Sequence, residues 1–162
     1  MRRGLLLVLL AAGCASAEAP AEPLFEGKPL AHWARQLHDL SPARAGEAGQ
    51  AIWRFGPPAI PAVRRALDSE ESNTRHAAAF ALRLLAVRHA DAPGVVPAVL
   101  YAMESEDAVL REHAVHALAH MDPSPPESAA VLQGLEADPS EPVRKAAAKA
   151  LETLVAKSAK SN

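Results

Sequence analysis

His113, His116 and His120 recur at helical spacing in the stretch HAVHALAH. Residues three, four or seven apart lie on one face of a helix, so these imidazoles would point to the same side. Neutral imidazole is the commonest metal ligand among side chains, which suggests a metal site in an enzyme. The other interpretation is that they are ordinary, partly exposed residues on the inner wall of a larger helical assembly.

The spacing counts against one shared metal ion. His113 and His116 can reach the same ion, but His120 lies about 10 Å from His113 along the axis, at a rise of about 1.5 Å per residue. A tetrahedral zinc site would need further ligands from other segments, and the single cysteine, Cys14, lies near the N-terminus. We therefore predict no metal and no cofactor. A small enzyme or a ligand or metal carrier that uses this histidine face stays as the alternative.

Composition and motifs point away from catalysis. The sequence contains no P-loop, no G-x-S-x-G, no H-E-x-x-H and no Rossmann glycine pattern. Hydrophobic residues make up 49% but aromatic residues only 4%, and a core of small aliphatic side chains favours helices packed on helices. The net charge of −2 gives no basic footprint for nucleic acid. These features predict a helical protein that is not an enzyme and has no nucleic-acid partner.

The first twenty residues, MRRGLLLVLLAAGCASAEAP, are typical of an export signal. Two arginines precede an apolar stretch at 5–12 that is too short to span a bilayer. The letters AAGC, which end at Cys14, resemble a bacterial lipobox, in which the cysteine is lipidated. A lone cysteine in an oxidising compartment is a liability unless its chemistry is used. We predict a signal peptide over 1–13 and a membrane anchor through lipid on Cys14.

A second processing site overlaps the first. The letters ASA, which end at Ala17, resemble an ordinary signal-peptidase site, so a soluble periplasmic or secreted form is the alternative to a cell-envelope lipoprotein. Ala15 stands where an aspartate would indicate retention in the inner membrane, and this resemblance favours the outer membrane. Residues 14–25 repeat Ala, Glu and Pro and predict an extended tether. We expect a folded domain at 26–157 and a disordered tail at 158–162.

The body of the chain repeats itself. Residues 60–85 align with residues 96–121 at an offset of 36, which places Leu82 over Leu118. A third copy at 131–154 follows at an offset of 33 and puts Leu151 in the same position. A degenerate first copy spans 30–56. Repeats of this length, each with two helical segments, are the signature of an α-solenoid.

Each copy predicts a pair of helices joined by a polar turn. The first helix begins near a proline, which the first turn of a helix tolerates. The second helix carries alanines and one leucine at helical spacing, so we expect Ala114, Leu118 and Met121 to be buried and Arg83 to face outward. Small residues at these positions let neighbouring backbones approach closely.

An arginine recurs at the start of the second helix, at positions Arg75, Arg111 and Arg144. Each follows an acidic turn. A guanidinium in this place can donate hydrogen bonds to carbonyls and carboxylates of a neighbouring turn. We predict a structural ladder along the stack, with a cationic track for a ligand as the alternative.

This pattern resembles HEAT repeats, in particular the short bacterial type. The residues that carry the resemblance are the proline in the first helix, the acidic turn, and VR followed by xxAxxAL in the second helix. The resemblance covers residues 30 to about 155 and implies an all-α fold, a right-handed α-solenoid of about four helix pairs. HEAT arrays are mostly scaffolds, but fold alone does not establish function.

In HEAT arrays the second helices line the concave side, which implies a surface for a partner. By position in the repeat, this surface would be built from Phe80, Leu84, His113, His116, His120 and Lys149. We predict an exported, lipid-anchored adaptor that binds an unknown protein partner through this concave face. A structural spacer without a specific ligand is a third hypothesis.

Overall fold

The computed structural model describes residues 22–161, which form a short hairpin followed by four helix pairs. The hairpin pairs β1 (Leu24–Phe25) with β2 (Lys28–Pro29) in antiparallel fashion. The helices follow as α1 (Leu30–Gln36), α2 (Pro42–Ile52), α3 (Ile60–Ala66), α4 (Ser72–Arg88), α5 (Val95–Met103), α6 (Ala108–His120), α7 (Ser128–Gly134) and α8 (Glu141–Ser161). Short 3-10 turns lie in the connections as η1 (Trp53–Phe55), η2 (Pro57–Ala59) and η3 (Leu135–Ala137).

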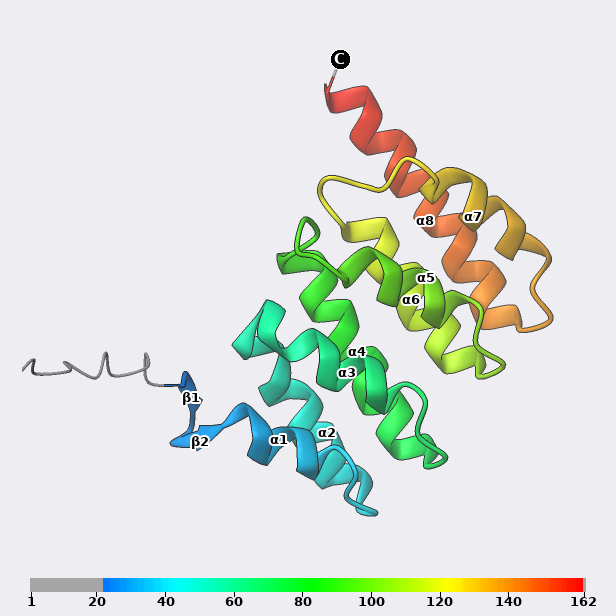
Figure 1. Cartoon of the computed structure of the whole chain (residues 1–162). Helices are drawn as coiled ribbons and strands as arrows, with labels where there is room; N and C mark the ends of the chain where they lie inside the picture. Colours follow the sequence, from blue (N-terminus) through cyan, green and yellow to red (C-terminus); the bar gives the residue numbers. More distant parts are fainter. Residues whose placement is uncertain (1–21, 162) are drawn as a thin grey trace, which may run out of the picture.

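The helix pairs stack in chain order, from α1 and α2 at one end to α7 and α8 at the other (Figure 1). This arrangement confirms the predicted all-α solenoid of helix pairs. Local signals set the element boundaries. Pro42 and Pro61 stand in the first turns of α2 and α3, where no backbone N–H is needed. Gly94, at φ +89°, reverses the chain before α5 in a conformation that glycine adopts without strain.

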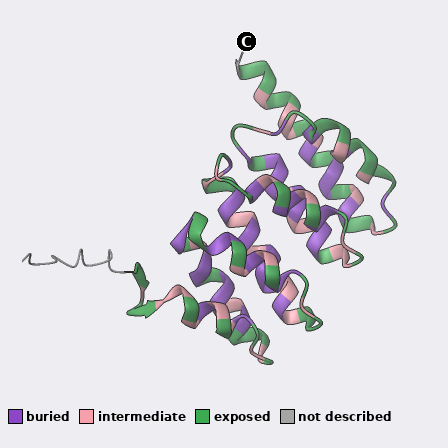
Figure 2. Cartoon of the chain, in the orientation of Figure 1, coloured by how far each residue is buried: buried purple, intermediate pink, exposed green. Residues whose placement is uncertain are grey.

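The core consists mainly of alanine and leucine side chains between the two helical layers. Buried residues follow the middle of the stack (Figure 2), and Ala114, Leu118 and Met121 are all buried as the repeat pattern predicts. The layers approach very closely in places: a Cβ added at Gly49 in α2 would lie 2.7 Å from the carbonyl oxygen of Ala77 in α4. Only glycine fits at such a contact, and alanine suffices elsewhere.

Of the three leucines that occupy the same position in the repeat, two are fully buried as expected. Leu82 and Leu118 are 1% and 0% exposed, because repeats pack on both sides of α4 and α6. Leu151 in α8 is only partly buried. Within the described chain no repeat follows α8, so one side of this leucine has no layer to pack against.

The second helices form the inner layer of a curved stack. Helices α2, α4, α6 and α8 contact their neighbours in the same layer much more extensively than α1, α3, α5 and α7 contact theirs. A stack whose layers differ in this way bends toward the tighter layer. We call the face that the second helices present the concave face; the functional surface was expected there.

Both ends of the domain depart from the predicted boundaries. Leu24 and Phe25, expected in a tether, form β1, and the ring of Phe25 lies 5.9 Å from that of the buried Trp33. Residues 158–161, expected in a disordered tail, are the last turn of α8. Helix α8 continues because its residues up to Lys160 have high helix propensity and its basic residues suit a helix C-terminus. The signal peptide and Cys14 lie outside the described residues.

Candidate functional site

His113 lies in the middle of the concave face, packed against α4. Its ring meets the ring of Phe80 edge to face at a centroid distance of 6.2 Å. Its Nδ1 is buried and has no hydrogen-bond partner among the described residues. Burial, reinforced by the positive charges of Arg83, His116 and His76, lowers the pKa of His113 to about 4. The imidazole is therefore neutral at physiological pH.

The other two histidines of HAVHALAH turn to different surroundings. His116 Nε2 lies 3.8 Å from a carboxylate oxygen of Glu112, and burial holds the pKa of His116 below its usual value although Glu112 opposes this shift. His120 is exposed, and its Nδ1 lies 3.0 Å from the carbonyl oxygen of His116. The three rings do not converge on a common point. Between residues 22 and 161, no three His, Cys, Asp or Glu side chains come close enough to hold a metal ion.

Phe80 and Leu84 line a hollow of about 630 Å³ at the N-terminal end of the concave face, here called the N-terminal hollow. Its wall combines α1, α2, α4, η1 and the hairpin. The remaining lining side chains are aromatic, charged or small, namely Phe25, Glu26, Trp33, Glu47, Gln50, Ala51, Trp53 and Arg54. The structure thus adds two tryptophans and a phenylalanine from outside the second helices to the two residues expected there.

His116 and Lys149 line a second hollow, of about 420 Å³, between α6 and α8. Most of its other lining residues are charged, namely Glu112, Glu141 and Lys145. Glu141 and Lys145 form an ion pair at 2.6 Å. The residues expected to form one partner surface therefore divide between two hollows, with His113 between them against Phe80 and His120 exposed at the end of α6.

A group of arginines beside the N-terminal hollow was not expected from the sequence. The guanidinium carbons of Arg54 and Arg88 lie 4.9 Å and 5.0 Å from the centre of the Trp53 ring. Arg83, expected to face outward, is half-buried with its guanidinium carbon 5.2 Å from the centre of the Phe80 ring. The prediction for Arg83 is wrong because Phe80, three residues earlier on the same helix, draws its side chain onto the aromatic surface. We call Arg54, Arg83 and Arg88 the stacked arginines.

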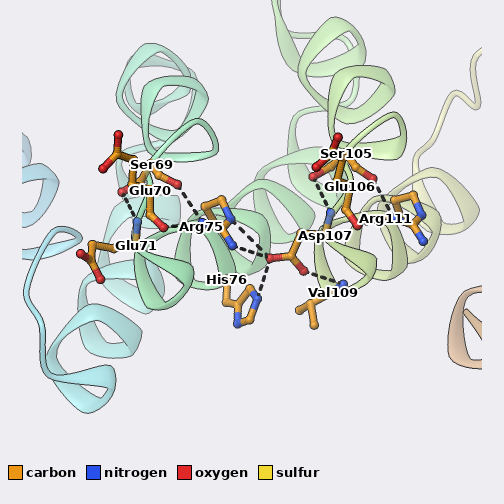
Figure 3. A network of polar contacts seen from close by, with 10 residues as sticks. All are labelled: Ser69, Glu70, Glu71, Arg75, His76, Ser105, Glu106, Asp107, Val109 and Arg111. Carbon is orange, nitrogen blue, oxygen red and sulfur yellow. Dashed lines mark hydrogen bonds and ion pairs between the residues drawn. The ribbon is translucent and has the colours of Figure 1, made fainter.

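The repeat arginines occupy a different part of the molecule, at the polar turns (Figure 3). Arg75 donates hydrogen bonds to the carbonyls of Ser69 and Glu70 in its own turn and to the carboxylate of Asp107 in the next repeat. His76 also lies 3.0 Å from Asp107, so the carboxylate is shared. Burial would raise the pKa of Asp107, but the hydrogen bonds from Arg75 and from the amide of Val109 hold it below its usual value.

The same arrangement is repeated one step along the stack. Arg111 donates to the carbonyls of Ser105 and Glu106 and makes two bonds of 2.8 Å to the carboxylate of Asp138. This ion pair is largely buried, with side-chain exposures of 10% and 4%. The hydrogen bonds from Arg111 lower the pKa of Asp138. Arg144, in the last pair, donates to the carbonyls of its own turn, at Asp138 and Pro139.

A capping turn underlies the ladder and was missed in the sequence. In every helix pair, a side-chain oxygen in the polar turn accepts the backbone N–H two residues later. The four accepting residues are Asp39, Ser69, Ser105 and Asp138. Aspartate and serine form such turns readily. The signal was present as a recurring Asp or Ser five or six residues before the arginine.

Comparisons with known proteins agree with this architecture. Residues 79–152 match a family model described as HEAT repeats. A designed armadillo repeat protein for modular peptide recognition superposes with a TM-score of 0.55 at 19% identity, over 79% of this chain and 65% of that chain. A designed armadillo repeat protein in complex with the peptide (KR)4 gives 0.54 at 19% identity, with the same coverage of both chains.

A third solved structure, an engineered protein, gives a TM-score of 0.52 at 22% identity and covers 76% of this chain and 61% of that chain. This chain thus spans less than two thirds of the length of each of these structures. No curated protein matches the sequence. Among the described residues, no helix is both long enough and apolar enough to cross a membrane. The helix-pair architecture and the match over residues 79–152 together make this chain similar to HEAT and armadillo repeat proteins.

Proposed function

We propose that this protein is a non-enzymatic scaffold that binds a protein partner through the concave face of its solenoid. The observation that carries the proposal is the N-terminal hollow, where Trp53, Phe80 and Leu84 remain partly accessible beside the buried core. Aromatic side chains in a recess are the usual anchors of protein interfaces. The designed armadillo relatives are built for peptide recognition, and the same kind of surface here supports the same kind of use.

The histidine face supports the alternative, an enzyme or a metal carrier, less well. Its three imidazoles point to different partners, as described above. His76 and Asp107 do form a His–Asp contact, but Asp107 also accepts hydrogen bonds from Arg75 and from the Val109 amide. This pair is a joint of the ladder between two repeats. The Ser105 hydroxyl accepts only the backbone N–H of Asp107, and among the described residues no hydroxyl or thiol is hydrogen-bonded to His76.

Site-specific photo-crosslinking tests the scaffold proposal. A photoreactive amino acid at Leu84 would lie in the N-terminal hollow, and one at Tyr101 would lie on α5 in the outer layer. We expect the Leu84 probe, expressed in the native host, to form one discrete adduct that the Tyr101 probe does not form. Equal adducts from both positions, or none from Leu84, would contradict binding through the concave face.

The proposal includes export and a lipid anchor on Cys14. The support is the order of sequence features at the N-terminus: two arginines, an apolar stretch and the letters AAGC. We expect Cys14→Ala to move the protein from the membrane fraction to the soluble fraction and to abolish labelling by a fatty-acid analogue. An intact mass that corresponds to a mature chain starting at Glu18 would rule out the anchor and favour the soluble exported form.

A further inference from the structure

The stacked arginines have no carboxylate partner within the described chain. The guanidiniums of Arg54 and Arg88 lie on the two-ring system of Trp53, and that of Arg83 lies on Phe80. None of the three forms an ion pair with another described residue, and the Nε of Arg83 is buried without a hydrogen-bond acceptor. In contrast, both inner arginines of the ladder, Arg75 and Arg111, form an ion pair with a carboxylate of the next repeat.

Stacking leaves an arginine ready to bind an anion. A guanidinium that lies near an aromatic ring contacts it through its face or edge, and its fork of five N–H donors remains able to bind a carboxylate with two parallel hydrogen bonds. The ring also restricts the long side chain, so less conformational entropy is lost when the carboxylate binds. The stacked arginines therefore combine positive charge with partial preorganisation.

The positive character continues along the concave face toward the C-terminal end. Lys149 projects into the hollow between α6 and α8 and forms no ion pair with another described residue. His113, between the two hollows, lies near the permanent positive charge of Arg83, and no carboxylate acts on it. This face contrasts with the chain as a whole, whose net charge is −2.

Acidic residues are present on this face but do not neutralise it. Glu26 and Glu47 line the N-terminal hollow, where Glu47 accepts a hydrogen bond of 3.5 Å from the side-chain amide of Gln36. Glu112 contacts His116, and Glu141 is paired with Lys145. Neither Glu26 nor Glu47 contacts a stacked arginine, so an incoming carboxylate meets free donors.

We propose that the concave face binds an extended acidic peptide segment that places an aromatic or large aliphatic side chain in the N-terminal hollow. The carboxylates of the segment pair with the stacked arginines, and its apolar side chain packs against Trp53, Phe80 and Leu84. This inference rests on the proposed scaffold function and specifies the chemistry of the partner. The peptide proposed here is negatively charged, whereas the designed armadillo repeat protein of similar fold is in complex with the basic peptide (KR)4.

Selection from a random peptide library tests the inference. The full chain is immobilised and dodecapeptides are selected for binding, and each enriched peptide is then measured by fluorescence anisotropy against two variants. Arg54→Gln/Arg88→Gln removes two stacked charges, and both side chains are exposed, so the fold should be retained. The matched control, Arg35→Gln/Arg65→Gln, removes two exposed charges from α1 and α3 in the outer layer.

We expect the enriched peptides to carry a net negative charge and at least one aromatic or large aliphatic residue. Binding should weaken on the order of tenfold in Arg54→Gln/Arg88→Gln and remain within about twofold in the control, since two charge-assisted contacts are lost only in the former. It should also weaken as salt increases.

Three results would overturn the inference. Enriched peptides that are basic or neutral, or acidic peptides that bind both variants equally, would show that the stacked arginines do not select the partner. The absence of any enrichment would overturn it as well. None of these results decides the scaffold proposal, which depends on the adduct formed from Leu84 in the crosslinking experiment.

Discussion

Two groups of arginines in this solenoid differ in whether a carboxylate accepts their hydrogen bonds. At the polar turns, Arg75 and Arg111 bind carbonyls of their own turn and a carboxylate of the next repeat. On the concave face, Arg54 and Arg88 lie on the ring of Trp53 without a carboxylate. An arginine whose donors are all satisfied holds the fold together, whereas an arginine with free donors is available to a partner. This difference distinguishes the arginines that stabilise the fold from those that can bind a partner.

The largest effect is expected at the buried joint of the ladder. Arg111→Ala should lower the free energy of unfolding by about 3–5 kcal/mol, because it leaves the buried carboxylate of Asp138 without its partner. Urea denaturation measures the change. The double variant Arg111→Ala/Asp138→Ala should recover part of the loss, since the unpaired charge is removed. A loss under about 1 kcal/mol for Arg111→Ala would mean that the ladder is not structural.

Substitutions in the leucine core give losses of stability with which the effect of Arg111→Ala can be compared. Leu118→Ala should lower the free energy of unfolding by about 2–5 kcal/mol, because it leaves a cavity between two layers. Leu151→Ala, at the equivalent position in the last repeat, should cost clearly less, since Leu151 is only partly buried. Denaturant titrations of the two variants compare them directly, and equal losses would show that the end of the array packs like its middle.

Acid should lower the stability of the fold in two pH ranges, one set by His113 on the concave face and one by Asp138 in the ladder. The pKa of His113 is about 4 in the folded chain against a usual 6.5, so the unfolded chain binds a proton first and stability falls as the pH drops from about 6.5 to about 4. The lowered pKa of Asp138 acts below its usual value of 3.8, where protonation of the unfolded chain again disfavours folding. Melting temperatures between pH 7 and pH 3 should show both ranges.

The variant His113→Gln separates the two contributions. It should reduce the loss of stability between about pH 6.5 and pH 4, where His116 with its lowered pKa still contributes. It should leave the loss at lower pH unchanged, because glutamine does not titrate while Asp138 still does. An identical pH profile for this variant and the parent chain would show that His113 does not control the upper range.

The smallest effect on stability is expected at the stacked arginines. Arg88→Gln should change the free energy of unfolding by under about 0.5 kcal/mol, because the side chain is exposed and has no carboxylate partner. Thermal unfolding followed by circular dichroism measures it. A loss as large as that of Arg111→Ala would remove the distinction between the two groups of arginines.

The sequence by itself determined the repeating fold. The spacing of Leu82 and Leu118, the prolines in the first helices and the alanines in the second helices each follow from local helix chemistry and period, and the structure confirms the stack of helix pairs that they predict. The recurrence of Arg75 and Arg111 at one position also lies in the sequence. Periodic patterns are readable in this way because every repeat meets the same neighbours.

Only the tertiary structure decided which side chains meet across repeats. It separated Phe80 and Leu84 from His116 and Lys149 into two hollows, it turned Arg83 onto Phe80, and it brought Arg54 and Arg88 together on Trp53. These contacts depend on the curvature of the stack and on residues far apart in the chain. No helical period encodes them, because a pattern within one helix specifies which face is buried but not which neighbouring side chain that face will meet.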